Sequence, residues 1–314
     1  MEKLNIGIFG SNGFIGNNLS IALINTFNFN KLYLFSRSIN PSISRLISEY
    51  PERIIHISID ILNPDSYKNQ IKELDVIYYL ISNSIPLTTW DSSKEEFNKN
   101  ILPFIDLLES LHQSKIKRFI YASSAGTVYG NSKEIKNENS VPSPFSPYGI
   151  GKLTMEYLIE FYANKFDFKH TTYRISNVYG PGQNTSSGLG FINKLIENIA
   201  KNISTPIYGN TIRNYVFIDD VITIFINSLK NIDSNSTIIN LASCDNLSTN
   251  EVLSIVGETL STKIKTTVYP KRMSDNPKII VSNKKLVKNN KNLQFTPISE
   301  GILKTFKYIN EFSK

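Results

Sequence analysis

Short hydrophobic runs and helical stretches alternate through the first half of the chain. The runs are rich in Ile, Val, Leu, Phe and Tyr, and they occupy 4–10, 31–37, 53–60, 75–82, 118–124 and 169–176. Apolar residues recur at helical spacing between them, most clearly at 97–113 and 151–166. Unbroken apolar strands separated by helices are typical of a parallel sheet covered on both faces. The pattern therefore predicts an α/β fold, a Rossmann doubly wound parallel sheet.

The rhythm changes after residue 176. The stretch 177–190, "NVYGPGQNTSSGLG", is rich in Gly, Ser and Asn, and shorter mixed elements follow it. A chain of 314 residues is long enough for two coupled domains. We expect a sheet domain over 1–176, with some later elements returning to it, and a smaller C-terminal α/β lobe over 177–314.

A glycine-rich loop, "GIFGSNGFIG", follows the first predicted strand and precedes a predicted helix. Glycine allows a sharp turn there and lets a pyrophosphate approach the amino end of the helix, where free N–H groups favour negative charge. A plain tight turn is the alternative, but the strand–loop–helix context favours dinucleotide binding. The expected cofactor contacts in this loop are Gly10, Asn12, Gly13, Phe14, Ile15 and Gly16.

The ends of the next strands carry the residues expected to contact the rest of the cofactor. The second strand ends in Ser36 and Arg37, with no acid; an acid there binds the 2′-hydroxyl of NAD, whereas Arg accommodates the 2′-phosphate of NADP. Taken alone, this feature favours NADP. Asp60 is placed to contact the adenine amino group, although a strand-end turn also explains it. Ile61 and Leu80 are assigned to the same site.

The stretch "SPFSPYGIGK" places Tyr148 and Lys152 four residues apart at the start of a predicted helix. Such residues share one face of a helix. A free phenol has a pKa of about 10, and a nearby ammonium together with a positive nicotinamide would stabilise the phenolate. An ordinary helix start, with the Tyr packed and the Lys solvated, is the alternative. The glycine-rich loop and "YASSAGTVYG" upstream favour a catalytic pair.

Six motifs carry a family resemblance that covers almost the whole chain: "GSNGFIG", "ASSAGTVYG", "SPYGIGKLTMEYLI", "RISNVYGPGQ", "IYGNTIRNYVFIDDV" and "KRMSDNPKIIVSNKKL". With these, the chain resembles the extended short-chain dehydrogenases/reductases, within them the NAD-dependent epimerase/dehydratase family, and most closely the UDP-glucose (UDP-hexose) 4-epimerases. The resemblance implies NAD as cofactor, with NADP as the alternative. It also implies that 1–176 is an NAD(P)-binding Rossmann domain and that 177–314 mainly binds a nucleotide sugar.

The resemblance assigns substrate contacts to the second half of the chain. Asn177 is expected to contact the nucleotide sugar, and Tyr208 to stack on the uracil. Arg213 and Arg272 are expected to hold the diphosphate, as guanidinium groups commonly do. Asp275 would lie near the ribose or orient Arg272.

The resemblance also assigns residues near the cofactor and a homodimer interface. Asn100 matches an asparagine near the cofactor, and Ser123 is placed in the cofactor site. The segment around Asn100 and the helix after Tyr148 resemble the pair that forms a four-helix interface in family dimers. We therefore expect a homodimer.

One position departs from the epimerase pattern. Epimerases of this family often carry a hydroxyl residue where this chain has Ala125, so the bond to the sugar oxygen at C4 is assigned to Thr127 and Ser124 jointly. Related dehydratases carry an Asp-Glu pair where this chain has Gly126 and Thr127, so water elimination lacks its general acid.

The sequence thus predicts a nucleotide-sugar 4-epimerase that acts on UDP-glucose and UDP-galactose or their N-acetylated equivalents, by transient oxidation at C4 with bound NAD. Two alternatives stay open. An NAD(P)H-dependent reductase of 4-keto sugars is favoured by Ser36 and Arg37. A non-catalytic dinucleotide-binding sensor is supported only by Ala125.

Several other classes of function are not indicated. The net charge is +7, but the Lys residues are scattered and lack interleaved aromatics, so no nucleic acid partner is expected. No apolar run reaches the roughly 18–20 residues of a membrane span. A single cysteine, Cys244, and the absence of a signal-peptide pattern predict a cytoplasmic protein. His56, His112 and His170 lack metal-ligand spacing, so no metal is expected.

Overall fold

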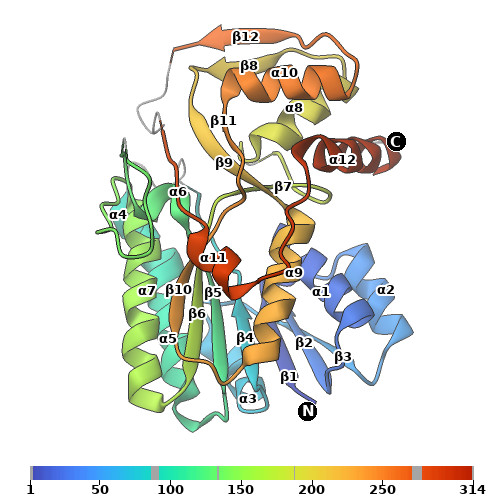
Figure 1. The fold of residues 1–314 in the computed structure, drawn as a ribbon. Coiled ribbons are helices and arrows are strands. Elements are labelled where there is room, and N and C mark those ends of the chain that lie inside the picture. The colour runs from blue at the N-terminus through green and yellow to red at the C-terminus, as the bar shows by residue number, and fades with distance from the viewer. Residues whose placement is uncertain (1–2, 86–91, 133, 187, 271–277, 313–314) are drawn as a thin grey trace. The chain divides into compact units, whose positions relative to one another are not determined.

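The computed structural model describes residues 3–85, 92–132, 134–186, 188–270 and 278–312 (Figure 1). The chain forms two compact units. The first consists of Met1–Ser124, Ser146–Arg174 and Ile222–Ile239. The second consists of Ala125–Phe145, Ile175–Val221 and Asn240–Lys314.

A seven-stranded sheet organises the first unit, with strand order β10-β6-β5-β4-β1-β2-β3. Its strands are β1 (Asn5–Phe9), β2 (Lys31–Ser36), β3 (Ile54–Ser58), β4 (Val76–Tyr79), β5 (Arg118–Ser124), β6 (Lys169–Ile175) and β10 (Thr237–Leu241). Strand β1 pairs in parallel with both β2 and β4, so the strand order reverses direction between β1 and β4. Ligands of open α/β sheets bind at the carboxyl ends of the strands at such a reversal.

Helices cover both faces of this sheet, as the continuous apolar runs predict. They are α1 (Phe14–Thr26), α2 (Pro41–Glu49), α3 (Lys68–Ile71), α4 (Ser93–Glu96), α5 (Leu102–Glu109), α7 (Pro147–Phe166) and α9 (Ile218–Ser228), with short turns η1 (Pro64–Ser66), η2 (Phe97–Ile101), η3 (Ser110–Gln113) and η4 (Leu229–Asn231). Every residue of β1 is buried. Because successive strand side chains point to opposite faces, both faces of β1 are covered. The predicted doubly wound Rossmann fold is confirmed.

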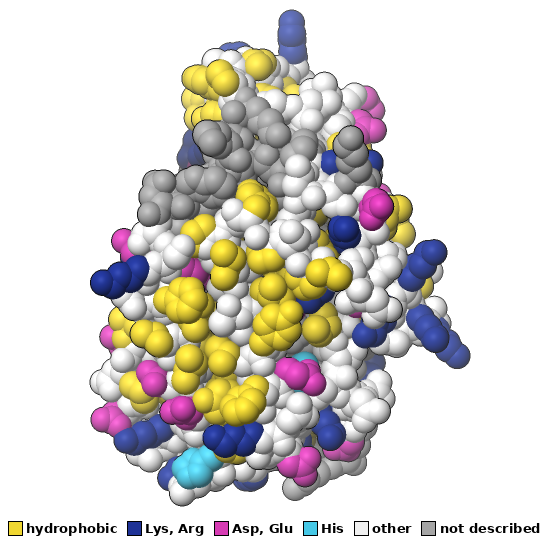
Figure 2. Space-filling model, turned by 90° about the vertical axis from the view of Figure 1, so that its left-hand side faces the viewer, with side chains coloured by type: hydrophobic (Ala, Val, Ile, Leu, Met, Phe, Trp, Pro, Cys, Tyr) yellow, Lys and Arg dark blue, Asp and Glu magenta, His cyan; other side chains and the backbone are white. Residues whose placement is uncertain are grey.

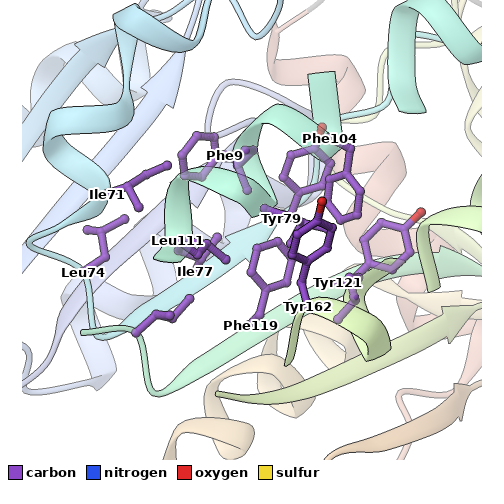
Figure 3. Packing of buried hydrophobic residues seen from close by; sticks show 14 of the residues in the cluster. Phe9, Ile71, Leu74, Ile77, Tyr79, Phe104, Leu111, Phe119, Tyr121 and Tyr162 are labelled. Carbon is purple, nitrogen blue, oxygen red and sulfur yellow. The ribbon is translucent and has the colours of Figure 1, made fainter. Parts of the chain in front are cut away.

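An aromatic core fills the space between the sheet and the helices α3, α5 and α7. Phe9 stacks on Phe35 with ring centroids 4.2 Å apart, and Tyr79 meets the edge of Phe104 at 4.7 Å. Figure 3 shows Phe104, Phe119 and Tyr79 together within this cluster. Aromatic pairs of this kind add to the stabilisation from burial alone. This packing fixes the strand ends on which the candidate site is built.

The second unit contains two small sheets and several helices. The sheets are β11-β9-β7 and β12-β8, formed by β7 (Asn177–Tyr179), β8 (Thr205–Tyr208), β9 (Ile212–Phe217), β11 (Asn246–Ser248) and β12 (Thr266–Tyr269). The helices are α6 (Ala125–Val128), α8 (Phe191–Ala200), α10 (Thr249–Thr259), α11 (Lys284–Asn289) and α12 (Ile298–Phe312). In the described ranges, none of the helices combines the length and the apolar character that crossing a bilayer requires.

The segment Ala125–Phe145 packs with the second unit, although the sequence boundary at 176 placed it in the first. Ala125 and Tyr129 form a small buried cluster with Ala242 and Val281. Lys136 also makes a β-bridge to Val281. These contacts join positions more than a hundred residues apart in the sequence, which local hydrophobic pattern does not reveal.

Candidate active site

The glycine-rich loop forms a tight turn at the carboxyl end of β1. Gly10 has a φ of +91°, which L side chains rarely adopt, and a Cβ on Gly16 would overlap the carbonyl oxygen of Gly10. A Cβ on Gly10 would itself lie 3.2 Å from the carbonyl carbon of Leu80, which follows β4. The loop therefore lies at the reversal point of the sheet, where two of the predicted cofactor segments meet.

Polar atoms in this loop fit a bound diphosphate. Helix α1 begins after Gly13, which provides no side-chain cap for its free N–H groups. Ser11 Oγ and Asn12 Oδ1 are buried, and neither has a hydrogen-bond partner among the described residues. The free N–H groups at the amino end of the helix and the Ser11 hydroxyl can donate hydrogen bonds, so they suit an anionic ligand. The Asn12 oxygen can only accept, so it suits a donor group of a ligand and not a phosphate oxygen. The residues present are therefore compatible with a dinucleotide cofactor, and Phe14 and Ile15 begin the helix beside it.

The ends of β2 and β3 carry the other predicted cofactor residues. Ser36 donates to the backbone oxygen of Ser38 at 2.7 Å and lies 3.0 Å from Nε2 of His56. Arg37 is exposed. Asp60 is exposed and accepts a hydrogen bond from the backbone N–H of Leu62 at 3.0 Å, so its carboxylate shapes a local turn. Ile61 beside it is buried.

Tyr148 and Lys152 come together because of how α7 begins. Ser146 caps the helix by accepting from the backbone N–H of Gly149 at 3.1 Å, and Pro147 occupies the first turn, where no N–H is needed. Tyr148 follows at once, and Lys152 comes one turn later. Lys152 Nζ donates to the oxygen of Ala122 at 3.1 Å and lies 5.6 Å from the ring centroid of Tyr148. Since Lys152 is only 6% exposed, it is not a solvated surface lysine.

Burial dominates the acid–base behaviour of this pair. It raises the pKa of Tyr148 to about 12; a side-chain hydrogen bond with Ser82 lowers that pKa, and the Glu96 charge raises it. Burial also lowers the pKa of Lys152 to about 8, against the opposing effects of Glu96 and Glu156. The sequence predicted that the Lys152 ammonium would lower the pKa of Tyr148. In the protein without a bound cofactor, burial has the larger effect and the pKa is raised.

A buried ion pair supports the site one turn beyond Lys152. Arg174 donates to Glu156 through Nη2 at 2.7 Å and through Nε at 3.1 Å to each oxygen, and both side chains are at most 4% exposed. Ser123 on β5 donates to the same carboxylate. Glu156 and Arg174 were not predicted from the sequence, although Glu156 follows Lys152 by four residues and therefore shares its helix face.

Asn100 and Ser124 also lie in the first unit. Asn100 is buried; its amide nitrogen donates to Ser84 Oγ and Glu96 Oε1, and its oxygen accepts from the N–H of Asn83 at 2.8 Å. Ser124 ends β5 and is half-buried. Glu96 was not foreseen from the sequence.

The remaining predicted residues belong to the second unit. Thr127 is buried, and its Oγ1 has no partner among the described residues. Asn177 donates to the oxygen of Asn214 at 2.9 Å, and Arg213 Nη1 donates to the backbone oxygen of Ile212. Tyr208 stacks on Tyr269, with ring centroids 5.4 Å apart. Arg272 and Asp275 lie outside the described residues.

Metal ligation is not indicated in the part of the chain that the structure describes. There, no three His, Cys, Asp or Glu side chains gather in a way that could hold a metal ion.

Comparison with known proteins places this arrangement in a family. The model of the NAD dependent epimerase/dehydratase family matches residues 6–242. The chain belongs to that family. Membership confirms the resemblance drawn from the six motifs and the expected NAD cofactor.

Individual relatives are distant but cover most of the chain. A putative UDP-glucose 4-epimerase of Methanocaldococcus jannaschii is 27% identical over 258 residues, which cover 79% of this chain and 80% of the relative. A dTDP-4-dehydro-6-deoxyglucose reductase of Escherichia coli is 26% identical over 60% of each chain.

Solved structures share the fold at full length. The UDP-glucose 4-epimerase of Thermotoga maritima has a TM-score of 0.88 at 22% identity and covers 99% of this chain and 100% of its own. The UDP-glucuronic acid 4-epimerase of Bacillus cereus, solved with UDP-glucuronic acid and NAD, has a TM-score of 0.88 at 24% identity, covering 98% and 99%.

We expect Gly16→Ala to weaken NAD binding at least about tenfold, equivalent to about 1.4 kcal/mol, because the added methyl overlaps the Gly10 carbonyl and forces the loop open. The measurement is the NAD retained by the purified protein, together with its affinity by calorimetry. Gly257→Ala in α10 is the control, since its methyl would lie 3.3 Å from the nearest atom, the backbone oxygen of Thr262. Equal NAD retention in both variants would contradict the assignment of this loop.

Proposed function

We propose that the protein is a UDP-sugar 4-epimerase. The observation that carries the proposal is the pairing of half-buried Tyr148 with buried Lys152 at the start of α7, where Lys152 donates to the Ala122 carbonyl near the end of β5. Relatives named as UDP-glucose 4-epimerases support it. Solved neighbours include epimerases of UDP-glucose and UDP-glucuronic acid.

The residues of the chain can perform a reversible proton transfer. NAD, when bound, supplies the hydride acceptor and donor at C4 of the sugar. Tyr148 takes the proton of the C4 hydroxyl and later returns it, while Ser124 and Thr127 bind the oxygen. Lys152 provides a positive charge beside the phenolate. Hydride and proton both return to the sugar, so the reaction leaves no net redox change.

UDP recognition is assigned to residues of the second unit. Arg213, with Arg272, would balance the charge of the diphosphate, and Tyr208 would stack on the uracil. Asn177 would bind the nucleotide sugar, and Asp275 the ribose or Arg272. The positive net charge of the chain suits an anionic substrate of this kind.

A reductase of nucleotide 4-keto sugars is the second candidate. Its support is the exposed Arg37 at the end of β2 and the similarity to the Escherichia coli reductase. A reductase would consume NADPH stoichiometrically, whereas an epimerase recycles its nucleotide.

The direct test is NMR of the purified protein with UDP-galactose, UDP-N-acetylgalactosamine or UDP-galacturonic acid and no added cofactor. We expect one of them to convert to an equilibrium mixture with its gluco epimer, because the resident NAD is regenerated in each turnover. Mass spectrometry of the nucleotide released on denaturation distinguishes NAD from NADP. No conversion of any sugar, combined with NADPH consumption on a 4-keto sugar, would replace the proposal by the reductase.

Replacement of the proposed base provides a second test. We expect Tyr148→Phe to lower kcat by about 10²–10⁴-fold, because the ring is kept while the proton acceptor is lost. Tyr157→Phe is a matched control on the same helix, since Tyr157 is 64% exposed and lies away from the buried pair. Steady-state kinetics would show near-normal kcat for the control, and a similar loss in both variants would contradict the role of Tyr148.

We also propose that the face of α5 and α7 forms a homodimer interface. Large apolar side chains are exposed along these helices and the preceding turn: Phe97, Leu102, Ile150, Tyr157 and Phe161. Figure 2 shows apolar side chains gathered over this side of the first unit. Large exposed apolar patches commonly mark interfaces, and a two-fold dimer needs only one self-complementary patch.

The exposed single cysteine, Cys244, fits the proposed cytoplasmic location.

We expect Phe161→Glu to convert the dimer to a monomer, because it places a charge on the apolar face, where Phe161 is 56% exposed. Light scattering after gel filtration measures the mass. Leu303→Glu, at an exposed position of α12, should remain a dimer. A monomeric wild-type protein, or a dimer in the Phe161→Glu variant, would exclude this interface.

A further inference from the structure

Glu96 is a buried carboxylate at the end of α4 that lies against α7 at Gly151, the residue before Lys152. It is 2% exposed. Its Oε2 accepts from Ser84 Oγ at 2.6 Å, and its Oε1 accepts from Asn100 Nδ2 at 3.0 Å. A Cβ on Gly151 would lie 2.6 Å from the same Oε1. The carboxylate therefore lies against the turn of α7 that carries Lys152.

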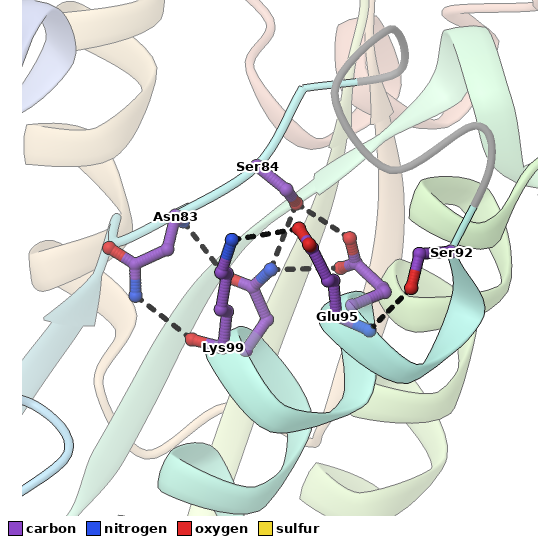
Figure 4. A network of polar contacts seen from close by, with 7 residues as sticks. Asn83, Ser84, Ser92, Glu95 and Lys99 are labelled. Atoms are coloured by element: carbon purple, nitrogen blue, oxygen red, sulfur yellow. Dashed lines mark hydrogen bonds and ion pairs between the residues drawn. The ribbon is translucent and has the colours of Figure 1, made fainter.

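Local sequence explains why this carboxylate is held so firmly. Ser92 caps α4 by accepting from the N–H of Glu95, and a π-helical turn, η2, follows. Pro103 has no N–H to offer to the carbonyl of Lys99, which instead accepts from the side chain of Asn83 at 2.9 Å. Figure 4 shows Asn83 and Ser84 facing this turn. These hydrogen bonds anchor the turn to the segment that follows β4.

The buried charges around Glu96 indicate which cation its carboxylate can balance. Glu156, on α7 beside Lys152, is already paired with Arg174 of β6. Among the described residues, no Lys, Arg or His nitrogen lies within 4 Å of the Glu96 carboxylate. A buried charge without compensation is strongly unfavourable. The buried ammonium of Lys152 is carried by the turn of α7 against which the Glu96 carboxylate lies.

Several other titratable groups on the elements around α7 have contacts of their own. On α4 and η2, Glu95 pairs with Lys99 at 2.8 Å, and both are half exposed. On α5, Glu109 accepts from the hydroxyl of Tyr162. On β5, the ring of Tyr121 lies 5.2 Å from Lys152 Nζ.

We propose that Glu96 is a positioning residue for Lys152, supplying the fixed negative charge that balances the buried ammonium beside Tyr148. The inference rests on the catalytic pair of the proposed function. Glu96 opposes the effect of burial on Lys152 and raises its pKa; on Tyr148 it adds to burial and raises that pKa as well. Removing the carboxylate charge should therefore lower both pKa values together.

The test uses Glu96→Gln, which keeps the size and hydrogen-bonding capacity of the side chain but not its charge. Lysine labelled with ¹³C at the ε position reports the titration of Lys152 in the full-length protein, and Lys152→Met assigns its signal. In the wild type we expect a midpoint of about 8. In Glu96→Gln we expect it about one unit lower. An unchanged midpoint in the folded variant would overturn the proposal.

Matched variants separate charge from structure. Glu95→Gln removes the neighbouring carboxylate, which is exposed, and should leave the midpoint unchanged. If Glu96→Gln does not fold, Glu96→Asp keeps the charge but withdraws it by one methylene, and we expect a smaller decrease. An unchanged or higher midpoint in that variant would equally overturn the proposal.

Turnover gives a second readout that a merely structural role would not produce. Because both pKa values fall, both limbs of the kcat–pH profile of Glu96→Gln should move to lower pH, whereas structural damage lowers kcat at every pH. The NMR titration needs no substrate, so a failure of the proposed epimerase function would leave it valid. An active epimerase with an unchanged Lys152 midpoint would remove the role of Glu96 alone.

Discussion

A lysine ammonium buried inside the first unit is the constraint around which the candidate site is built. Lys152 is almost inaccessible to solvent, so the hydration it loses must be replaced by the protein. The carbonyl of Ala122 accepts one hydrogen bond, and the ring faces of Tyr121 and Tyr148 offer further favourable contacts. These partners come from the end of β5 and the first turns of α7, which explains why those elements meet there.

Buried opposite charges extend the same requirement to neighbouring elements. Glu156 lies one turn beyond Lys152, and Arg174 donates three hydrogen bonds to its carboxylate, which replace contacts with water. Ser123 adds a hydroxyl donor to that carboxylate. Strand β6 is thereby tied to α7 and β5 by a network that would lose much of its stability if one charge were removed.

The sequence was sufficient to predict those features of the fold and of the candidate site that depend on local backbone geometry. The strand pattern predicted β1 to β6 within a few residues, the glycine spacing predicted the turn after β1, and the helix start predicted that Tyr148 and Lys152 share a face. Non-local features were not accessible. Glu96 lies more than fifty residues from Lys152, and the pKa of Tyr148 depends on burial by several elements. Likewise, 125–145 joins the second unit through contacts with residues far away in the sequence, such as those of Ala125 and Tyr129 with Val281.

A buried carboxylate near Tyr148 and Lys152 has opposite effects on the charged forms of these two residues. A carboxylate near Lys152 favours the charged amine, yet it also disfavours the phenolate of Tyr148, whose pKa burial already raises to about 12. At neutral pH the protein by itself therefore keeps the tyrosine protonated. The hydrogen bond with Ser82 acts against this, but burial is the larger effect. A further positive charge close to the ring would favour ionisation of the tyrosine, because it stabilises the phenolate against the effect of burial.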